Sequence, residues 1–518
     1  MSITCNNGNC GNVATGFCAC AQGCNSTASG ACSHAQGEKT LASGGASHSE
    51  GSNTEAREFA SHAEGFMSIA NNADAHAEGE RTLASGGASH AEGGSTQATG
   101  VYAHAEGFNT VSSGEISHAE GEATTASGGA SHTEGSNTSA IAFASHAEGN
   151  MTQATGVDSH AEGESTIAGG GAAHAEGSNT QASGAYSHAE GISTIASGEE
   201  AHAEGGETVA SGLAAHAEGG QTLASGIAAH AEGGQTVASE TAAHAEGGQT
   251  QSSGVGSHAE GLTSIASAPA AHAEGFGNVA DAYASHAAGQ FNQTNGHNGA
   301  YIVGQFGDAD ANYSWFVGNG FGGTRGLAAK LISSTGNMFI DGMYFSGGAD
   351  YAEMFETVDG QPIESGYFVT SRGKKVQKAN TDDYILGITS ATPAIIGDSG
   401  ELRWKGKYVQ DEWGKVQYHE VIAPPVKDFT GREIVPESVE IRPIINPNWN
   451  QATRYVPRSS RPEWVVVGLL GKIFVRDDGT CQIDGFCKPN AEGIATAAQE
   501  GYRVLERTGP NQVRVLFR

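Results

Sequence analysis

The first 321 residues of this 518-residue chain are almost without basic side chains, proline and tryptophan. They hold three of the 26 lysines and arginines but 33 of the 57 aspartates and glutamates, whereas the remainder holds 23 basic and 24 acidic residues. Eleven of the twelve prolines lie at Pro362 or later, and all five tryptophans lie at Trp315 or later. Two physically different regions therefore meet between about residues 300 and 350.

The shortage of basic residues also excludes a class of partner. Binding to nucleic-acid phosphates needs clustered Lys and Arg that release counterions, and this chain has a formal net charge of −31, so we expect no nucleic-acid partner. No run of 18 or more apolar residues occurs, so we expect no membrane insertion. The start, from Met1 to Cys5, lacks the basic and apolar segments of a secretory signal. We expect a protein made in the cytoplasm that reaches a surface by cell lysis or by assembly inside the cell.

Cysteine is nearly absent after residue 32. Six of the eight cysteines lie within the first 32 residues, and they are Cys5, Cys10, Cys18, Cys20, Cys24 and Cys32. Their spacing departs from the paired C-x-x-C pattern of structural zinc sites. Our preferred interpretation of residues 1–32 is an anchoring segment that cross-links chains through disulfides, with a zinc site or packed reduced thiols as the alternatives. We expect no cofactor.

What the first region does contain is a strict repeat. Nineteen histidines follow one another at intervals of fourteen residues from His34 to His286, in a unit close to S-H-A-E-G-x-x-T-x-A-S-G-x-A. Two glycines about seven residues apart predict two short strands and two tight turns per unit. Each unit is then one coil of a solenoid over residues 33–290. At about 4.8 Å per coil, nineteen coils are roughly 90 Å long.

The alternation of side chains assigns the faces of each coil. Ser61 and Ala63 point one way and His62 and Glu64 the other, so the small residues are expected to fill the interior. A core this thin buries little apolar area, so the solenoid needs partners along its flank. We place the His/Glu column at an interface between chains, where the two side chains hydrogen-bond across it. Rings of three histidines that bind a transition metal are the alternative interpretation. The second column, which begins at Leu41, mixes apolar residues with glutamine and is expected to be exposed.

The repeat over residues 20 to 290 resembles the head repeats of the YadA-type trimeric autotransporter adhesins, which carry an S-V-A-I-G motif in 14-residue turns. The resemblance implies an all-β fold, a left-handed parallel β-roll, with three rolls packed about one axis. His62 and Glu64 occupy the positions that face that axis in the family, where the family has Val and Ile. The chain lacks the stalk and membrane anchor of an autotransporter, so export by that route is not implied.

The region after residue 290 has a different composition. Residues 291–349 bring larger aromatic side chains and are predicted to form a β-rich transition or tip. Short runs rich in β-branched residues, such as 384–388, 464–470 and 513–517, predict a mostly β domain over residues 350–518.

The segment Ser346-Gly-Gly-Ala-Asp-Tyr-Ala-Glu-Met-Phe-Glu356 carries the chemistry. Gly347 and Gly348 allow a strained backbone, and two carboxylates three residues apart could share a proton, although an isolated D-x-x-E is more often a solvated turn. The segment resembles the junction motif of the intramolecular-chaperone auto-processing domains of Bacillus phage neck-appendage proteins and related Bacillus surface proteins. The similarity covers about residues 335 to 518 and includes Gly468-Leu-Leu-Gly-Lys472.

This second resemblance implies a domain that assembles three chains, templates their fibre and then cuts itself off. The cut is expected between Ala349 and Asp350, with Asp350 and Glu353 as the required carboxylates. The activity is then that of a single-turnover autoproteolytic endopeptidase, without multiple turnover.

Two functions follow as hypotheses. The first is a homotrimeric structural fibre on a spore or similar extracellular surface, assembled by a disposable chaperone. The second is a phage tail or neck appendage, part of a virion, that binds a host glycan. A freely diffusing hydrolase is disfavoured, because the sequence has no pattern for a cleft-forming α/β region or a catalytic triad.

Overall fold

The computed structural model describes residues 5–7, 10–400, 402, 406–427, 431–450, 452 and 454–518. The chain divides into two compact units, one of Met1–Asp341 with Pro425–Pro436 and one of Gly342–Pro424 with Glu437–Arg518. The described elements are strands, apart from one short 3-10 helix, η1 (Arg458–Ser460). Among these described residues, no helix has the length and apolar character that crossing a bilayer requires.

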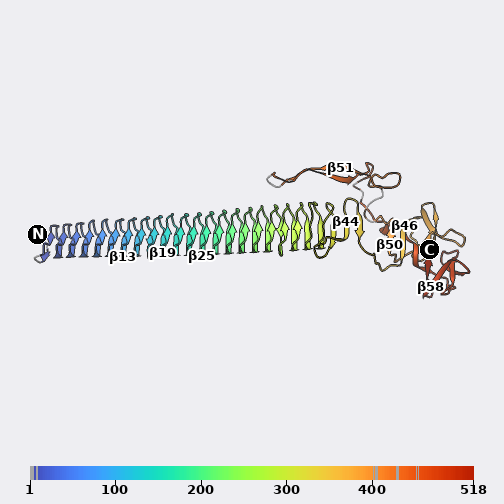
Figure 1. The fold of residues 1–518 in the computed structure, drawn as a ribbon, viewed down its shortest axis with the longest axis horizontal. Coiled ribbons are helices and arrows are strands. Elements are labelled where there is room, and N and C mark those ends of the chain that lie inside the picture. The colour runs from blue at the N-terminus through green and yellow to red at the C-terminus, as the bar shows by residue number, and fades with distance from the viewer. Residues whose placement is uncertain are drawn as a thin grey trace. The chain divides into compact units, whose positions relative to one another are not determined.

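The first unit is built around a β-roll of 14-residue coils, which confirms the predicted fold class (Figure 1). In one sheet the strand spans the histidine and the next four residues, from β5 (His34–Glu38) to β41 (His286–Gln290), and it is shortened in β17 (His118–Ala119) and β37 (His258–Ala259). In the other sheet a two-residue strand lies seven residues after the histidine, from β6 (Leu41–Ala42) to β40 (Val279–Ala280). Neighbouring coils pair in parallel and in register, histidine beside histidine and alanine beside alanine.

The coils extend beyond the range predicted for them. Before residue 33 the structure has β1 (Cys5–Asn7), β2 (Val13–Ala14), β3 (Cys20–Cys24) and β4 (Thr27–Ala28). The segment assigned to anchoring is therefore itself wound into the roll, with Cys20 paired to His34.

The roll also continues past residue 290. β42 (Tyr301–Gln305) pairs in parallel with β41 after one inserted residue, and β43 (Trp315–Asn319) follows fourteen residues later. The chain then reverses into β44 (Leu327–Ile332) and β45 (Asn337–Ile340), which are antiparallel. The first part of the predicted transition region is thus two more coils in which larger apolar and aromatic residues replace the small ones.

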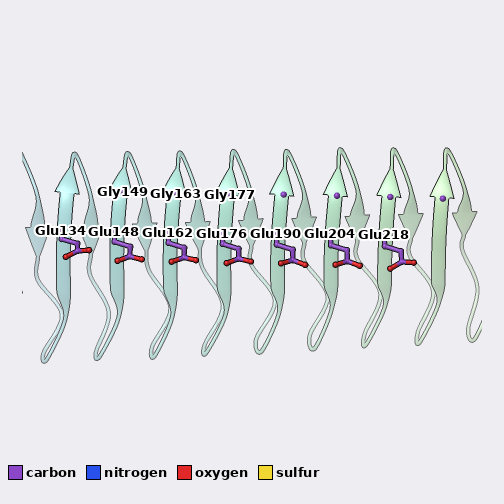
Figure 2. Close-up of a pocket in the computed structure, with 14 residues that line it drawn as sticks. Glu134, Glu148, Gly149, Glu162, Gly163, Glu176, Gly177, Glu190, Glu204 and Glu218 are labelled. Atoms are coloured by element: carbon purple, nitrogen blue, oxygen red, sulfur yellow. The ribbon is translucent and has the colours of Figure 1, made fainter.

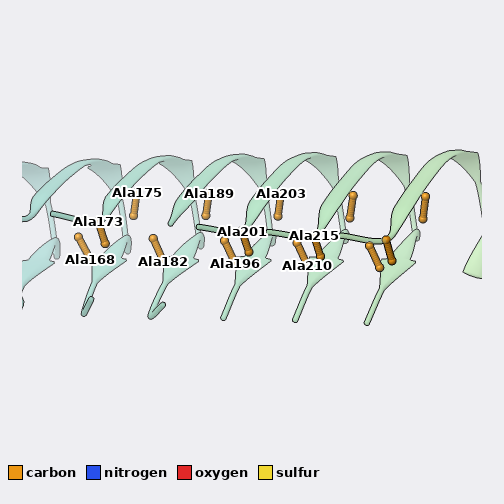
Figure 3. Packing of buried hydrophobic residues seen from close by; sticks show 14 of the residues in the cluster. Ala168, Ala173, Ala175, Ala182, Ala189, Ala196, Ala201, Ala203, Ala210 and Ala215 are labelled. Atoms are coloured by element: carbon orange, nitrogen blue, oxygen red, sulfur yellow. The ribbon is translucent and has the colours of Figure 1, made fainter. Parts of the chain in front are cut away.

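The interior of the roll is filled by alanine, serine and threonine, as the alternation predicts. Ala63 is fully buried and Ser61 nearly so, while His62 and Glu64 lie half-buried on the outer face. Figure 3 shows the buried alanines of several coils, from Ala168 to Ala215, lining the interior.

The glycines have a different role from the one predicted. Residues in the left-handed conformation form the corners of the coil, and most are not glycine, as at Ala60 and Met67. Gly65 lies inside a strand, where a Cβ atom would stand 2.2 Å from the carbonyl oxygen of Gly79 in the next coil. Close approach between coils, rather than the turn itself, therefore explains the glycine three residues after each histidine.

The second unit is organised by a ten-stranded sheet, which agrees with the predicted mostly β domain. The strand order is β50-β46-β48-β47-β49-β55-β59-β58-β56-β57, with β46 also paired to β55. Its core includes Phe368, Ile388, Ile473 and Val515, all buried. The strands are β46 (Asp350–Thr357), β47 (Phe368–Arg372), β48 (Lys375–Lys378), β49 (Gly387–Thr389), β50 (Ile395–Gly397), β55 (Trp464–Arg476), β56 (Phe486–Pro489), β57 (Ala495–Ala498), β58 (Tyr502–Gly509) and β59 (Gln512–Phe517).

Two hairpins lie in the segment between β50 and β55. The first pairs β51 (Tyr418–Ala423) with β54 (Ser438–Pro443), and the second pairs β52 (Val426–Lys427) with β53 (Glu433–Val435).

Candidate functional site

The predicted cleavage bond lies at the start of β46, which runs between β50 and β55. The carbonyl oxygen of Ala349 accepts a hydrogen bond from the amide of Lys472 at 3.2 Å, and that of Asp350 accepts one from the amide of Ala394 at 2.7 Å. Both carbonyls that flank the amide nitrogen of Asp350 are therefore held by neighbouring segments. The bond is fixed inside the sheet rather than in a solvated turn.

Asp350 is a buried carboxyl group, with only 4% of the residue exposed. Burial raises its pKa above the ordinary value, and a hydrogen bond with the side chain of Ser390 opposes part of that rise. Its Oδ2 atom is buried without a hydrogen-bond partner. A buried carboxyl of this kind retains its proton to higher pH than a solvated one, as a general acid must.

Glu353 lies on the other face of β46. The hydroxyl of Tyr351 donates a hydrogen bond to Oε1 of Glu353 at 2.7 Å, and the Cγ atom of Glu353 packs near Gly397. The expectation that Asp350 and Glu353 share a proton therefore does not hold within one chain, because side chains three residues apart on a strand point in opposite directions.

Sequence reasoning missed the groups on the neighbouring strands that contact the bond. Gly468 and Lys472 lie in β55 and Ser390 follows β49. The segment 468–472 was one of the matching stretches in the sequence, but its place beside the bond appears only when β46 and β55 pair.

The second chemical feature is the His/Glu ladder, formed by the nineteen histidines from His34 to His286 and by the glutamates from Glu50 to Glu274 that follow them by two residues. Successive imidazole rings stack with their centroids 4.5 to 4.9 Å apart. Figure 2 shows part of the glutamate row, from Glu134 to Glu218, along a shallow groove.

The ladder leaves its polar groups poorly paired within one chain. The Nε2 atoms of all nineteen histidines are buried without a hydrogen-bond partner. The ion-pair distances from Nε2 to a glutamate oxygen run from 3.5 Å at His48 to 4.0 Å at His174, beyond good hydrogen-bond length. Each buried polar group left unpaired costs about 1–3 kcal/mol, so the ladder favours further contacts outside the single chain.

The ladder also contains groups of metal-ligating residues, such as His62, Glu64 and His76. Adjacent rings lie almost parallel, with 2° between the planes of His62 and His76. Parallel rings direct their nitrogen lone pairs side by side instead of toward one point, so we assign no metal to these groups.

The N-terminal cysteines lie on the roll as free thiols wherever their side chains are described. Cys10, Cys18 and Cys32 are exposed, and Cys24 is half-buried. Cys20 stands at the head of the His/Glu ladder. Cys5 lies in β1, and its side chain falls outside the described residues.

Comparison with known proteins supports a self-cleaving C-terminal region. Residues 304–512 match the family model Peptidase_G2, the IMC autoproteolytic cleavage domain. The chain is 37% identical over 206 residues to the pre-neck appendage protein of Bacillus phage B103, a match covering 39% of this chain and 22% of that protein. It is 35% identical over 190 residues to the putative phage-related protein YobO of Bacillus subtilis (strain 168), covering 36% of this chain and 22% of YobO.

Among solved structures, the bacteriophage phi29 gene product 12 C-terminal fragment aligns at 34% identity and a TM-score of 0.27, over 33% of this chain and all of that one. The match to the two curated relatives, the pre-neck appendage protein and YobO, spans only about a fifth of the length of each. The chain joins a β-roll to a C-terminal region that matches a self-cleaving family.

Proposed function

We propose that this chain is a subunit of a phage neck-appendage fibre, whose C-terminal region assists assembly and then cuts itself off between Ala349 and Asp350. The observation that carries the proposal is the match of residues 304–512 to an autoproteolytic family, together with the buried Asp350 at the expected bond. The relatives named as pre-neck appendage proteins favour a virion over the spore surface as its location.

The reaction is the hydrolysis of one peptide bond. The oxygen of water adds to the carbonyl carbon of Ala349, the bond to the nitrogen of Asp350 breaks, and that nitrogen takes up a proton. The proton that the water loses returns to the carboxyl group that supplied the first one. In this proposal Asp350 supplies the proton, a role supported by the burial that keeps its carboxyl protonated to higher pH and by the fact that Asp350 carries the leaving nitrogen itself. The chain is its own substrate, so each chain reacts once.

Glu353 supports the reaction from the opposite face of β46. Its bond to Tyr351 holds the exposed side of the strand next to the cleaved bond. We therefore assign Glu353 a positioning role within its own chain.

A homotrimer is part of the proposal, with the His/Glu ladder facing the partner chains. The unpaired Nε2 atoms of the ladder gain hydrogen-bond partners only if other groups cover them. The same column continues into Tyr301 and Trp315, whose rings stack 4.9 Å apart, and Trp315 is 63% exposed in the single chain. A polar column that ends in an exposed apolar one is what an interface between identical copies would use.

Two finer elements belong to the same proposal. Exposed Cys10, Cys18 and Cys32 could form disulfides between chains once an oxidant reaches them. Phe321, which is 82% exposed within residues 291–349, offers a ring on which a host glycan could stack.

The test is the size of the purified protein. On a denaturing gel and by intact mass, the wild-type chain is expected as fragments of 349 and 169 residues, which together make up its 518 residues. The Asp350→Ala variant is expected to remain whole, because it lacks the acid. A wild-type chain found only at full length would contradict the processing step.

A further inference from the structure

The backbone around the cleavage bond is held from two sides. β55 provides the amide of Lys472 to the carbonyl of Ala349, and the segment before β50 provides the amide of Ala394 to the carbonyl of Asp350. Gly348 also lies against the segment before β50, because a Cβ atom at Gly348 would stand 2.4 Å from the nitrogen of Ala394. These contacts leave the peptide unit little freedom to rotate.

The side chain of Asp350 is held by a different set of contacts. A Cβ atom added to Gly468 would lie 2.7 Å from Oδ2 of Asp350 and 2.6 Å from Cδ1 of Ile473, so the carboxyl occupies the space that a side chain would take. The pairing of β46 with β55 shifts register here, from Tyr351 opposite Leu470 to Ala352 opposite Gly468. Such a bulge re-aims side chains beside it.

Ser390 is the third residue close to the Asp350 carboxyl. Its amide donates a hydrogen bond to the carbonyl oxygen of Val466 at 2.9 Å, which fixes it to β55. Its side chain hydrogen-bonds to the Asp350 carboxyl, while Oδ2 of that carboxyl has no partner. Oδ2 is therefore the oxygen of this carboxyl that no hydrogen bond engages.

We propose that Gly468 and Ser390 are positioning residues for self-cleavage, which fix the Asp350 carboxyl, while the amide of Lys472 holds the carbonyl of Ala349 and stabilises the negative charge that develops on it. This inference rests on the proposed self-cleavage between Ala349 and Asp350. An amide already aimed at the oxygen that becomes charged lowers the barrier without reorganisation.

The first experiment compares Gly468→Ala with Gly347→Ala in the full chain. Gly347 precedes the bond in the Gly347-Gly348 pair, but its backbone is outside the left-handed region and a Cβ atom there meets nothing within 4 Å, so the strain expected from the sequence is not found at Gly347. Displacement of a reacting group by about 1 Å costs on the order of 100-fold in rate, so Gly468→Ala should cut about that much more slowly, and Gly347→Ala at the wild-type rate. Cleavage is followed by denaturing gel over time, and tryptophan fluorescence checks that both variants fold.

The second experiment uses the pH dependence of the cleavage rate, which a purely structural role would not alter. Removal of the hydroxyl in Ser390→Ala removes a hydrogen bond that lowers the pKa of Asp350, so the inflection of the rate profile should move to higher pH. Ser390→Thr keeps a hydroxyl and should restore the wild-type profile.

The outcomes separate this inference from the proposed function. If the wild type stays whole or cuts at another bond, the self-cleavage itself is wrong. If the wild type cuts as expected but Gly468→Ala matches Gly347→Ala, or the Ser390→Ala profile superimposes on that of the wild type, the positioning roles are wrong while self-cleavage stands.

Discussion

At the scale of single residues, the glycine three positions after each ladder histidine lies in close contact with the next coil. It occurs in every coil from Gly23 to Gly289 and has φ near +100° in most of them. Both the conformation and the carbonyl of the next coil exclude a side chain there. The other glycine of the repeat is replaced in six coils, where Glu58, Asn72, Ala142, Glu240, Ala268 and Ala282 occupy its position.

Two adjacent glycines of one coil provide a matched comparison. At Gly219 a Cβ atom would lie 2.2 Å from the carbonyl oxygen of Gly233, whereas at Gly220 it would meet nothing within 4 Å. Gly219→Ala is therefore expected to destabilise the roll by at least about 1–3 kcal/mol from backbone strain alone, while Gly220→Ala leaves it close to wild type. Thermal unfolding followed by circular dichroism measures the difference. Equal melting temperatures would show that neighbouring coils are not packed as closely as described.

At this scale the sequence predicted which residues face inward but not why the glycines recur. The alternation of Ser61, His62, Ala63 and Glu64 is enough to assign faces, because strand geometry is local. The contact between Gly65 and Gly79 is not local, and it follows only from how closely two coils stack. For the same reason Asp350 and Glu353 could be chosen from the sequence, while Ser390 and Gly468 required the paired sheet.

At the scale of elements, the His/Glu ladder is a long row of coupled ionisable groups. Burial and the neighbouring imidazoles lower the pKa of seven of its histidines, that of His76 to about 4. The other six are His34, His48, His90, His118, His146 and His244. Hydrogen bonding between successive carboxyl groups raises the pKa of Glu78 and Glu120 to about 7 and raises that of Glu232.

These shifts predict that acid destabilises the roll. A histidine whose pKa is lower when folded stabilises fully above about pH 6.5, and this contribution is lost as the pH falls toward the folded value. A glutamate whose pKa is raised has the opposite effect between its ordinary pKa and about 7. Seven histidines with a lowered pKa outnumber three glutamates with a raised pKa, and the lowered pKa of Glu106 and Glu134 acts only below about pH 4.5, so the melting temperature should be lower at pH 5 than at pH 7.5.

Far-UV circular dichroism follows the roll in that experiment. Tryptophan fluorescence serves as the internal control, because four of the five tryptophans lie after residue 400. A melting temperature that does not change between pH 7.5 and pH 5 would contradict the lowered pKa values of the ladder histidines.

Among the elements, the roll is longer than the sequence predicted. Tyr301-Ile-Val-Gly304 and Trp315-Phe-Val-Gly318 repeat the position of the strict glycine, but the histidine is gone and one residue is inserted before the first of them. Backbone pairing between coils tolerates that change, because it depends on register and not on side-chain identity.

At the scale of the whole molecule, the proposal requires three copies. A core of alanine, serine and threonine supplies little apolar burial for each residue, so a single roll has little to offset its chain entropy. Sedimentation equilibrium of the Asp350→Ala variant, which keeps both regions together, should give three times the chain mass of 52.7 kDa. A stable monomer would contradict the homotrimer and the inward-facing ladder together.

The role of the C-terminal region in assembly has its own test. A chain that ends at Ala349 lacks the region that is proposed to bring three copies together, so it should yield aggregates or monomers in place of trimers. The matched control is the same 349-residue product made by cleavage of the complete chain. If both forms sediment as trimers, the region is not needed for assembly.

Because the coils stack in register, the number of fourteen-residue units in the sequence sets the length of the roll. From His34 to His286 every coil has the same number of residues, so gain or loss of one fourteen-residue unit changes the length by one step of about 4.8 Å and leaves each lateral column unbroken. A change of seven residues would instead exchange the two flanks beyond that point. Duplication or deletion of whole units can therefore adjust reach without any redesign of the surfaces that meet neighbouring copies.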